Sequence, residues 1–377
     1  MYNVYQHWDP LKTCVVGRSY PPEFYSWIKV PHVRSLFERI AIETEEDFQA
    51  VIHKLQEFNV TVLRPEITLI QDDVVRNPPP MTPRDLMVMV GDRFYKNWKS
   101  NLKSSYNNVR DSSWPDCNSW DEFDQLPLNI QDECLTQFNF ASMRAADLDY
   151  QYRNVLNHVC QQGNKICQSP TSLINGALIA RIGRDLFIGT EEYSQDITGI
   201  LSVVEPEFPE YRCHVVNTGG HADGTYCPVA PGLIISLNDV PTYANTYGPD
   251  WEVVYLPDQS WDQVRPFLDL KKKNKGKWWI PGFEYDQDVV DVVETWLGHW
   301  TGYVEETVFD VNMLIIDPKN VMVFNYNKKV FDALERYGIT PHIVPLRHRY
   351  FWDGGIHCVT LDLHREGTMQ DYFPNRT

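Results

Sequence analysis

Short apolar runs recur in pairs along this chain, and a tight turn separates the two runs of each pair. A glycine or proline turn between two runs of strand length predicts a β-hairpin. Three hairpins are predicted, at 86–95, 177–188 and 313–324. Further apolar strands near residues 13, 233 and 359 provide anchors for related units. The irregular spacing indicates a weak internal repeat of strand and helix units, which suits a closed ring of small sheets around one central site.

Other segments carry apolar side chains at the spacing of a helix. Residues 44–58 present one apolar face, and Thr44 is the expected N-cap because an acidic residue follows it three positions later. Residues 328–337 form a second predicted helix that ends at Gly338, and residues 288–300 form a third. Additional strands are expected at 60–63 and 212–216 and at 232–237.

Residues 96–150 depart from this regularity. They are polar and rich in tryptophan, with little periodicity, so we interpret them as an irregular excursion over the surface that contains short helices. The expected organisation is a single domain over residues 1–377 with this excursion inserted. Five lysines within 271–277 are interpreted as a solvated loop rather than a binding patch for an anion.

Composition limits the class of partner. The chain has 377 residues, 43% of them hydrophobic, and a formal charge of -17. That charge argues against nucleic acid or an anionic membrane as the main partner. There is no apolar run of 18 residues, so no membrane-spanning helix is expected. The N-terminal residues lack a basic start and an apolar core, and the eight cysteines form no Cys-x-x-Cys pair. These features favour reduced thiols and a cytoplasmic location, without a zinc knuckle or a disulfide framework.

The most informative stretch for chemistry is residues 351–361. Gly354 and Gly355 allow backbone and ligand to approach closely, and Cys358 follows at the mouth of a predicted half-buried strand. A thiol in that position is a candidate nucleophile, because a thiolate needs access and a polarising neighbour. The alternative is a buried cysteine that only starts the strand.

Two other stretches offer groups that complement a thiol. In His221-Ala222-Asp223, the alternation of an extended chain places His221 and Asp223 on one side, and Asp85 follows a proline turn. Two carboxylates can clamp a planar guanidinium, a thiolate can attack its central carbon, and an imidazole can move the protons. Each fragment alone has a simpler explanation, as a loop histidine or as a carboxylate that caps a turn.

Together these segments resemble the arginine amidinotransferases, the family that includes glycine amidinotransferase and the inosamine-phosphate and cyanotoxin enzymes of the pentein superfamily. The resemblance spans residues from about 8 to 370. Five segments carry it: Trp8-Asp9-Pro10-Leu11 with Val15-Val16-Gly17-Arg18, Pro83-Arg84-Asp85, Arg181-Ile182-Gly183-Arg184-Asp185-Leu186-Phe187, His221-Ala222-Asp223, and Gly354-Gly355-Ile356-His357-Cys358-Val359-Thr360 with Arg365-Glu366-Gly367. It implies an α/β fold, a five-bladed propeller with a pseudo-fivefold axis and a central active site.

The resemblance also implies a reaction and its residues. The amidino group of L-arginine would pass through a covalent thiouronium on Cys358 to an amine acceptor, with release of L-ornithine. His221 would be the acid and base, Asp85 and Asp223 would hold the guanidinium, and Gly220 and Gly355 would lie against the substrates. No metal and no organic cofactor are implied. A homodimer is left open.

Two departures from the family pattern affect this expectation. The family's Asp-Ala-Ala-Asp becomes Asn175-Gly176-Ala177-Leu178. Asn175 can orient an imidazole through its amide oxygen, but it cannot stabilise an imidazolium by charge. Three explanations remain: Asn175 suffices, another carboxylate replaces it, or the chain is a degenerate relative. In addition, Thr218-Gly219-Gly220 lacks the bulk expected before the histidine, which favours an acceptor larger than glycine unless the glycines only form a turn.

Two other functions therefore compete with amidino transfer. One is an arginine deiminase-like hydrolase, in which water replaces the acceptor amine. The other is a protein that binds arginine or a guanidinium group without catalysis.

Overall fold

We describe the fold from a computed structural model of the chain. The described residues are 1–67, 77–98, 110–117, 120–123, 125–137, 147–190, 194–237, 246–248, 250–256, 278–283, 285–298, 300–301, 308–352 and 354–376. The lysine-rich run at 271–277 lies outside them, as do parts of the excursion predicted at 96–150.

Within these residues the strands form five sheets of three strands each, and one pattern repeats in all of them. An antiparallel pair is followed by a third strand that runs parallel to the middle one. The sheets are β15 (Thr360–Arg365), β1 (Leu11–Val16), β2 (Thr61–Leu63); β3 (Met87–Val90), β4 (Arg93–Lys96), β5 (Lys165–Gln168); β6 (Ile179–Ile182), β7 (Asp185–Gly189), β8 (Arg212–Val216); β9 (Tyr226–Ala230), β10 (Leu233–Ser236), β11 (Glu252–Tyr255); and β12 (Leu314–Asp317), β13 (Asn320–Val323), β14 (Thr340–Ile343).

The first of these sheets joins the two ends of the chain. In it β15 pairs antiparallel with β1 and places Arg365 opposite Leu11. The residues before β1 also form bridges to two other sheets, from Val4 to Gly91 and from Gln6 to Ile182. The predicted repeat of small sheets is confirmed, and five sheets with one strand pattern agree with the expected α/β propeller fold.

The three predicted hairpins are confirmed as the pairs β3–β4, β6–β7 and β12–β13. Their apolar strands are long enough to be recognised, and glycine takes a positive φ in two of the turns, at Gly91 and Gly183. The strands β5, β9, β11 and β14 are not predicted from the sequence. β5, β11 and β14 have only four residues each with mostly exposed or partly exposed side chains, and β9 contains Pro228.

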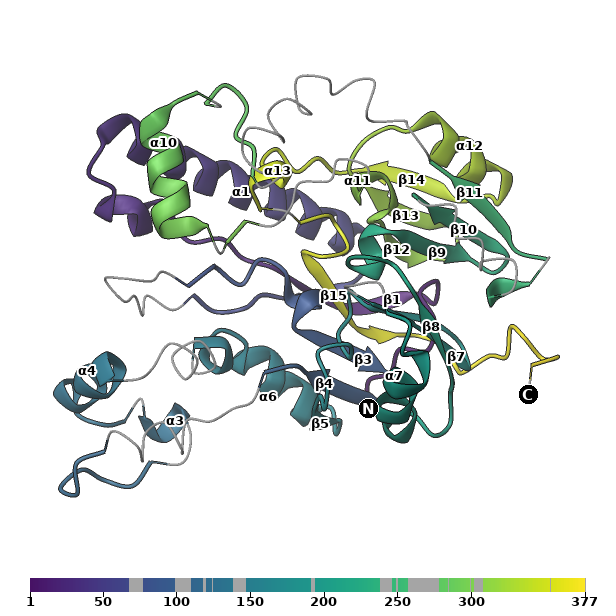
Figure 1. Ribbon diagram of the computed structural model, residues 1–377, viewed down its shortest axis with the longest axis horizontal. Coiled ribbons are helices and arrows are strands. Elements are labelled where there is room, and N and C mark those ends of the chain that lie inside the picture. The colour runs from purple at the N-terminus through teal and green to yellow at the C-terminus, as the bar shows by residue number, and fades with distance from the viewer. Residues whose placement is uncertain are drawn as a thin grey trace.

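Helices connect the strands and cover the sheets (Figure 1). The described helical segments are η1 (Pro22–Trp27), α1 (Pro31–Glu57), η2 (Pro83–Asp85), α3 (Trp120–Phe123), α4 (Leu128–Gln137), α6 (Arg153–Gln161), α7 (Ile197–Val204), η3 (Glu205–Glu207), η4 (Ala222–Gly224), α10 (Gln287–Val292), η6 (Val293–Leu297), α11 (Val308–Val311), α12 (Lys328–Arg336) and α13 (Arg349–Trp352). The short helices α3 and α4 fall within the excursion predicted at 96–150. None of the described helices is long and apolar enough to cross a membrane.

Two details of the sequence prediction are wrong. Thr44 is not an N-cap, because α1 begins 13 residues earlier at Pro31. Thr44 is instead buried inside the helix, where its hydroxyl donates to the carbonyl of Ile40 at 2.6 Å. The strand β15 is also not half-buried, since Thr360 and Asp362 on its polar side are as inaccessible as the leucines on the other side.

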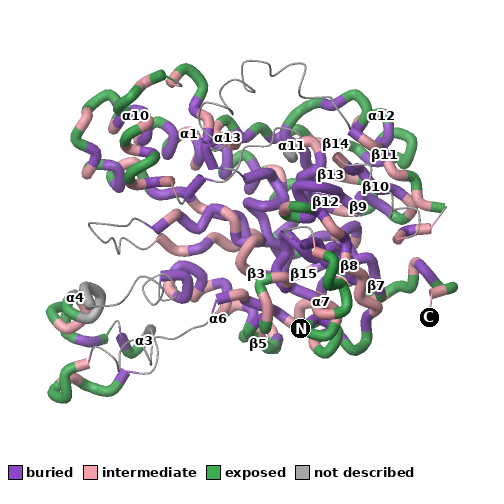
Figure 2. The backbone as a smooth tube through the Cα atoms, viewed as in Figure 1, coloured by how far each residue is buried: buried purple, intermediate pink, exposed green. Residues whose placement is uncertain are grey.

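Asp362 is buried because it belongs to an ion cluster inside the protein. Buried residues gather along the sheets, as Figure 2 shows. Arg181 contacts both carboxylate oxygens of Asp362 at 2.9 Å, Arg365 donates from Nε at 2.7 Å, and Arg84 Nη1 lies 3.1 Å from Oδ1. Burial alone would raise the pKa of Asp362, but the three arginines outweigh it and hold that pKa well below its usual range. The carboxylate is therefore ionised and balances part of their positive charge.

We expect Asp362→Asn to lower the free energy of unfolding by about 3–5 kcal/mol, because it leaves three buried guanidinium groups without their counterion. Urea unfolding followed by tryptophan fluorescence measures this change. Glu366→Gln is the matched control, since that carboxylate lies on the surface in an ion pair with Lys12 and its loss should leave the unfolding midpoint unchanged. Equal midpoints for the wild type and Asp362→Asn would contradict the proposed importance of the cluster.

Candidate active site

Cys358 lies in a turn immediately before β15 and is buried, with 6% of its surface exposed. The turn is fixed by backbone hydrogen bonds from Val359 to Gly355 and from Thr360 to His357. From the ion cluster, Arg84 Nε donates to the carbonyls of His357 and Thr360, each at 2.8 Å. The turn that carries the thiol is therefore held by its own backbone hydrogen bonds and by Arg84.

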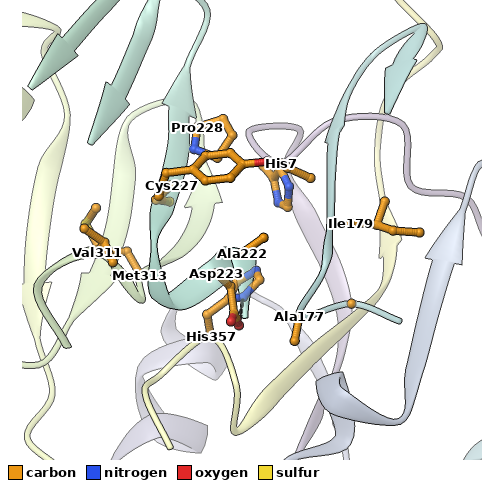
Figure 3. Close-up of a pocket in the computed structure, with 13 residues that line it drawn as sticks. His7, Ala177, Ile179, Ala222, Asp223, Cys227, Pro228, Val311, Met313 and His357 are labelled. Atoms are coloured by element: carbon orange, nitrogen blue, oxygen red, sulfur yellow. Dashed lines mark hydrogen bonds and ion pairs between the residues drawn. The ribbon is translucent and has the colours of Figure 1, made fainter. Parts of the chain in front are cut away.

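Asp223 in η4 presents its carboxylate to the thiol. The Cys358 Sγ donates to Asp223 Oδ2 at 3.4 Å. The same oxygen lies 2.8 Å from His357 Nδ1, and Figure 3 shows this pair of side chains. Burial, and then the positive charge of Arg84, lower the pKa of His357 well below its usual value. A neutral His357 therefore donates its Nδ1 proton to Asp223 and fixes the direction of the carboxylate.

Asp85 and His221 form a second pair at the same site. Asp85 ends η2, His221 immediately precedes η4, and His221 Nδ1 lies 3.8 Å from Asp85 Oδ1. This distance is too long for a hydrogen bond but close enough for an electrostatic interaction. The His221 side chain is 41% exposed and the Asp85 side chain is 27% exposed. The pair therefore lies on the open side of the cluster, where a substrate can reach it.

The charges of these groups shift one another's protonation. Burial raises the pKa of Asp223 to about 6, the charge of His221 opposes that rise, and the charge of Asp85 adds to it. Burial also raises the pKa of Asp85. The pKa of the Cys358 thiol is raised well above its usual value by burial and then by the negative charges of Asp223 and Asp85. The ligand-free site therefore favours the protonated thiol.

Two carboxylate oxygens in this cluster lack a hydrogen-bond donor. Asp85 Oδ1 and Asp223 Oδ1 are buried and have no hydrogen-bond partner among the described residues. Buried carboxylate oxygens without donors are unfavourable, so they mark a place where a ligand with N–H groups would be bound. A planar cation that offers donors to both oxygens would also offset the two negative charges beside the thiol.

Asn312 is a site residue that is not predicted from the sequence. It lies between α11 and β12, and its amide Nδ2 donates to Cys358 Sγ and to the carbonyl of Asp223, each at 3.1 Å. Its Oδ1 accepts from the backbone N–H groups of His357 and Cys358 at 2.8 and 3.2 Å. A single polar residue before an apolar strand carries no motif, so nothing in the sequence identifies it.

Gly355 and Gly220, the two glycines that are expected to contact substrates, have different surroundings. A Cβ at Gly355 would lie 2.0 Å from Asn312 Oδ1, so the absence of a side chain at Gly355 makes room for Asn312. A contact of Gly355 with a substrate stays a prediction. A Cβ at Gly220 would meet no atom of the described residues within 4 Å, and the same holds for Gly219. The loop before His221 therefore borders open space.

Asn175 does not have the predicted contact with the imidazole among the described hydrogen bonds. Its Oδ1 accepts from the backbone N–H groups of Ala177 and Leu178 at 2.9 and 3.0 Å, and its Nδ2 donates to the carbonyl of Ser172 at 2.7 Å. These bonds close the turn before β6. The prediction that Asn175 orients His221 is thus corrected, and the carboxylate that faces His221 is Asp85.

Behind Asp223 and His357 lies a pocket lined mainly by apolar side chains (Figure 3). His7 also lines it, and His7 Nε2 accepts from the backbone N–H of Arg181 at 3.1 Å. Burial, and then the charge of Arg181, lower the pKa of His7 well below its usual value. Apolar side chains and a neutral His7 therefore line this side of the Asp223–His357 pair, where a low dielectric strengthens the effect of nearby charges.

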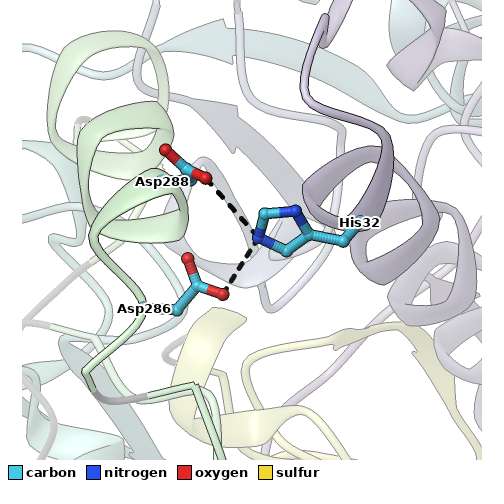
Figure 4. Close-up of side chains that lie close together, drawn as sticks. All are labelled: His32, Asp286 and Asp288. Carbon is cyan, nitrogen blue, oxygen red and sulfur yellow. Dashed lines mark hydrogen bonds and ion pairs between the residues drawn. The ribbon is translucent and has the colours of Figure 1, made fainter.

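One group of side chains among the described residues has the composition of a metal site, at the N-terminal ends of α1 and α10 (Figure 4). His32 Nε2 lies 3.0 Å from Asp286 Oδ2 and 3.8 Å from Asp288 Oδ2. Asp286 already accepts from the backbone N–H of Val289 as the cap of α10. His32 and Asp288 are exposed, so the group is explained as a surface ion pair that links the two helices.

Comparisons with known proteins agree with this fold. The chain is 24% identical to "Glycine amidinotransferase, mitochondrial" of Xenopus tropicalis, over 98% of this chain and 84% of the relative. It is 21% identical to "Inosamine-phosphate amidinotransferase 1" of Streptomyces glaucescens, over 99% of both. The solved structure of an amidinotransferase from Microseira wollei in the saxitoxin biosynthetic pathway has the same fold, with a TM-score of 0.63, 18% identity and 99% coverage of both chains. No family model matches the chain. The resemblance to the amidinotransferases is confirmed.

We expect Asn175→Asp not to raise any catalytic rate that depends on His221, because the side chain of Asn175 holds a turn instead of the imidazole. The substitution places a carboxylate oxygen where Nδ2 donates to Ser172, which should lower the free energy of unfolding by about 1–3 kcal/mol. Chemical denaturation and steady-state product release measure the two effects. A faster enzyme would show instead that residue 175 acts on His221.

Proposed function

We propose that this chain, which resembles amidinotransferases along its whole length, transfers the amidino group of L-arginine to an amine acceptor and releases L-ornithine. The observation that carries the proposal is the pair of buried carboxylate oxygens, Asp85 Oδ1 and Asp223 Oδ1, beside the thiol of Cys358. Guanidinium is planar, cationic and rich in N–H donors, so it complements that arrangement better than a simple amine or a neutral group.

Binding of the cation prepares the nucleophile. Negative charges on Asp223 and Asp85 raise the pKa of the Cys358 thiol, after burial itself, in the ligand-free protein. A guanidinium held between those carboxylates offsets both charges and favours the thiolate. The thiol therefore becomes reactive when the substrate is in place, close to the carbon that it attacks.

The covalent step forms a bond between Cys358 Sγ and the guanidinium carbon. His221 takes the thiol proton and gives it to the nitrogen that remains with ornithine, and the bond from carbon to that nitrogen breaks. The product on the enzyme is an amidino group on sulfur. An acceptor amine then attacks its carbon and transfers a proton to His221, and the departing sulfur regains that proton.

The loop before His221 supports an acceptor larger than glycine. Gly219 has a φ of 64° and no atom lies within 4 Å of an added Cβ at Gly219 or Gly220. Thr218 directs its hydroxyl to the carbonyl of Gly220 at 2.6 Å, so the loop is fixed without side chains that face the open space. We therefore infer a bulky primary amine as the acceptor.

The first test mixes the protein with L-arginine and no acceptor, and measures intact mass together with ornithine and citrulline. We expect a mass gain of one amidino group on Cys358 with stoichiometric ornithine, and no adduct in Cys358→Ala. Multiple turnovers to citrulline would instead establish a hydrolase. Binding of arginine without an adduct or a product would establish a binding protein. A screen of primary amines, with glycine as the reference, then identifies the acceptor.

The affinity for arginine should rise with pH between about 5 and 7. Protonated Asp223 cannot clamp a cation, and its pKa is raised to about 6, so the binding-competent carboxylate accumulates as the pH passes through that value. Calorimetry with Cys358→Ala, which prevents turnover, measures this dependence. Asp223→Asn should bind about tenfold or more weakly at pH 7 and lose the dependence. Asp85→Asn should bind more weakly but retain it. A flat profile in the Cys358→Ala protein would contradict the role of Asp223.

A further inference from the structure

A buried amide connects the nucleophile, the neighbouring carboxylate and a different sheet unit. Asn312 immediately precedes the hairpin of β12 and β13, whereas Cys358 precedes β15 in the sheet that joins the chain ends. Asn312 is fully inaccessible to solvent. A buried polar side chain in this position is maintained only if its hydrogen bonds are satisfied.

All the hydrogen-bonding capacity of that amide is used. Its two N–H groups reach Cys358 Sγ and the Asp223 carbonyl, and its oxygen accepts from the backbone N–H groups of His357 and Cys358. The orientation of the amide follows from these partners, because backbone N–H groups cannot accept from an NH₂ group. The nitrogen must therefore face the sulfur.

The absence of a side chain at Gly355 provides independent geometric support. A Cβ there would lie 2.0, 2.3 and 2.6 Å from Oδ1, Cγ and Cβ of Asn312. No side chain at residue 355 fits while Asn312 holds this position. At the neighbouring Gly354, an added Cβ would lie 3.3 Å from Val359 Cγ1, a contact that a small adjustment relieves.

We propose that Asn312 positions the Cys358 thiol and stabilises its thiolate by a hydrogen bond from Nδ2 to the sulfur. The surroundings of the sulfur explain the need for this donor. The Asp223 carboxylate accepts from the thiol and opposes its ionisation, as does the charge of Asp85. A neutral amide can stabilise the thiolate without repelling the guanidinium of the substrate, whereas a lysine or arginine would compete for the same carboxylates.

The backbone partners of Asn312 extend its effect to the carboxylate. His357 is held through its N–H by Asn312 Oδ1 and through its carbonyl by Arg84, and its ring then fixes Asp223. Asn312 also holds the Asp223 carbonyl directly. A displaced Asn312 would therefore misplace both the nucleophile and a group that binds the substrate.

The test measures the reactivity of the Cys358 thiol without any substrate. The inference rests on the role proposed for Cys358. The result of this test does not depend on whether arginine is the substrate. The protein is treated with iodoacetamide between pH 6 and 10.5, and alkylation of Cys358 is followed by peptide mass spectrometry. Cys160, which is exposed and far from the site in sequence, serves as the internal reference in every sample.

Asn312→Asp separates the two functions of the amide. A carboxylate still accepts from the two backbone N–H groups, but it removes the donor to sulfur and adds a third negative charge. We expect the alkylation profile of Cys358 to move upward by at least one pH unit, with a tenfold or larger loss of rate below the thiol pKa. Cys160 should be unaffected. A folded Asn312→Asp protein with the wild-type profile would overturn the proposal.

Gly355→Ala provides a second test that leaves the amide in the sequence. The added methyl group must displace Asn312, so we expect an upward shift of the Cys358 profile in this variant as well. Gly354→Ala is the matched control, with the same change one residue earlier, and should retain the wild-type profile. If Asn312→Asp does not fold, a wild-type profile in folded Gly355→Ala overturns the proposal by itself. Thermal unfolding of each variant establishes that it is folded.

Discussion

The ionised carboxylate of Asp362 is the interaction on which the rest of the structure depends. Three arginines from separate parts of the chain, Arg84, Arg181 and Arg365, converge on it in a region without access to solvent. One carboxylate cannot neutralise three guanidinium groups, so the guanidinium groups also donate hydrogen bonds to backbone carbonyl oxygens. Arg181 donates to Met89, and Arg365 donates to Asp9 and Ile315. The cluster therefore fixes backbone from several sheets against one centre.

The same cluster determines the electrostatics of the site above it. Arg84 directs its charge toward Asp362 and its Nε toward the turn that carries Cys358, so one side chain links the ion cluster to that turn. Its positive charge also contributes, after burial, to the low pKa of His357, which keeps that ring a neutral donor to Asp223. Thus the buried positive charge stabilises the fold and also selects the protonation state of a residue beside the thiol.

Patterns in the sequence predict the hairpins, which the fold confirms, and motifs in the sequence single out the charged residues of the candidate site, because both have local signals. Two apolar runs around a turn define a hairpin, and the segments with Asp85, His221, Asp223 and Cys358 match family motifs. The resemblance could not place Asn312, whose partners lie 46 residues away at Cys358 and 89 away at Asp223. It also gave Asn175 a contact with the imidazole, whereas local backbone donors occupy its oxygen. Competition between local and distant partners is decided only by the folded geometry.

The pairing of β1 with β15 has a consequence for how the protein is made. Cys358 lies just before β15, and that strand completes a sheet that also contains β1. During synthesis, a nascent chain already contains both carboxylates and the imidazole long before the thiol leaves the ribosome. Closure between such distant partners is expected to be late and slow, since a large loop must be ordered first. Assembly of the candidate site is therefore coupled to the pairing of β15 with β1. A chain that ends before β15 lacks a cysteine held beside Asp223.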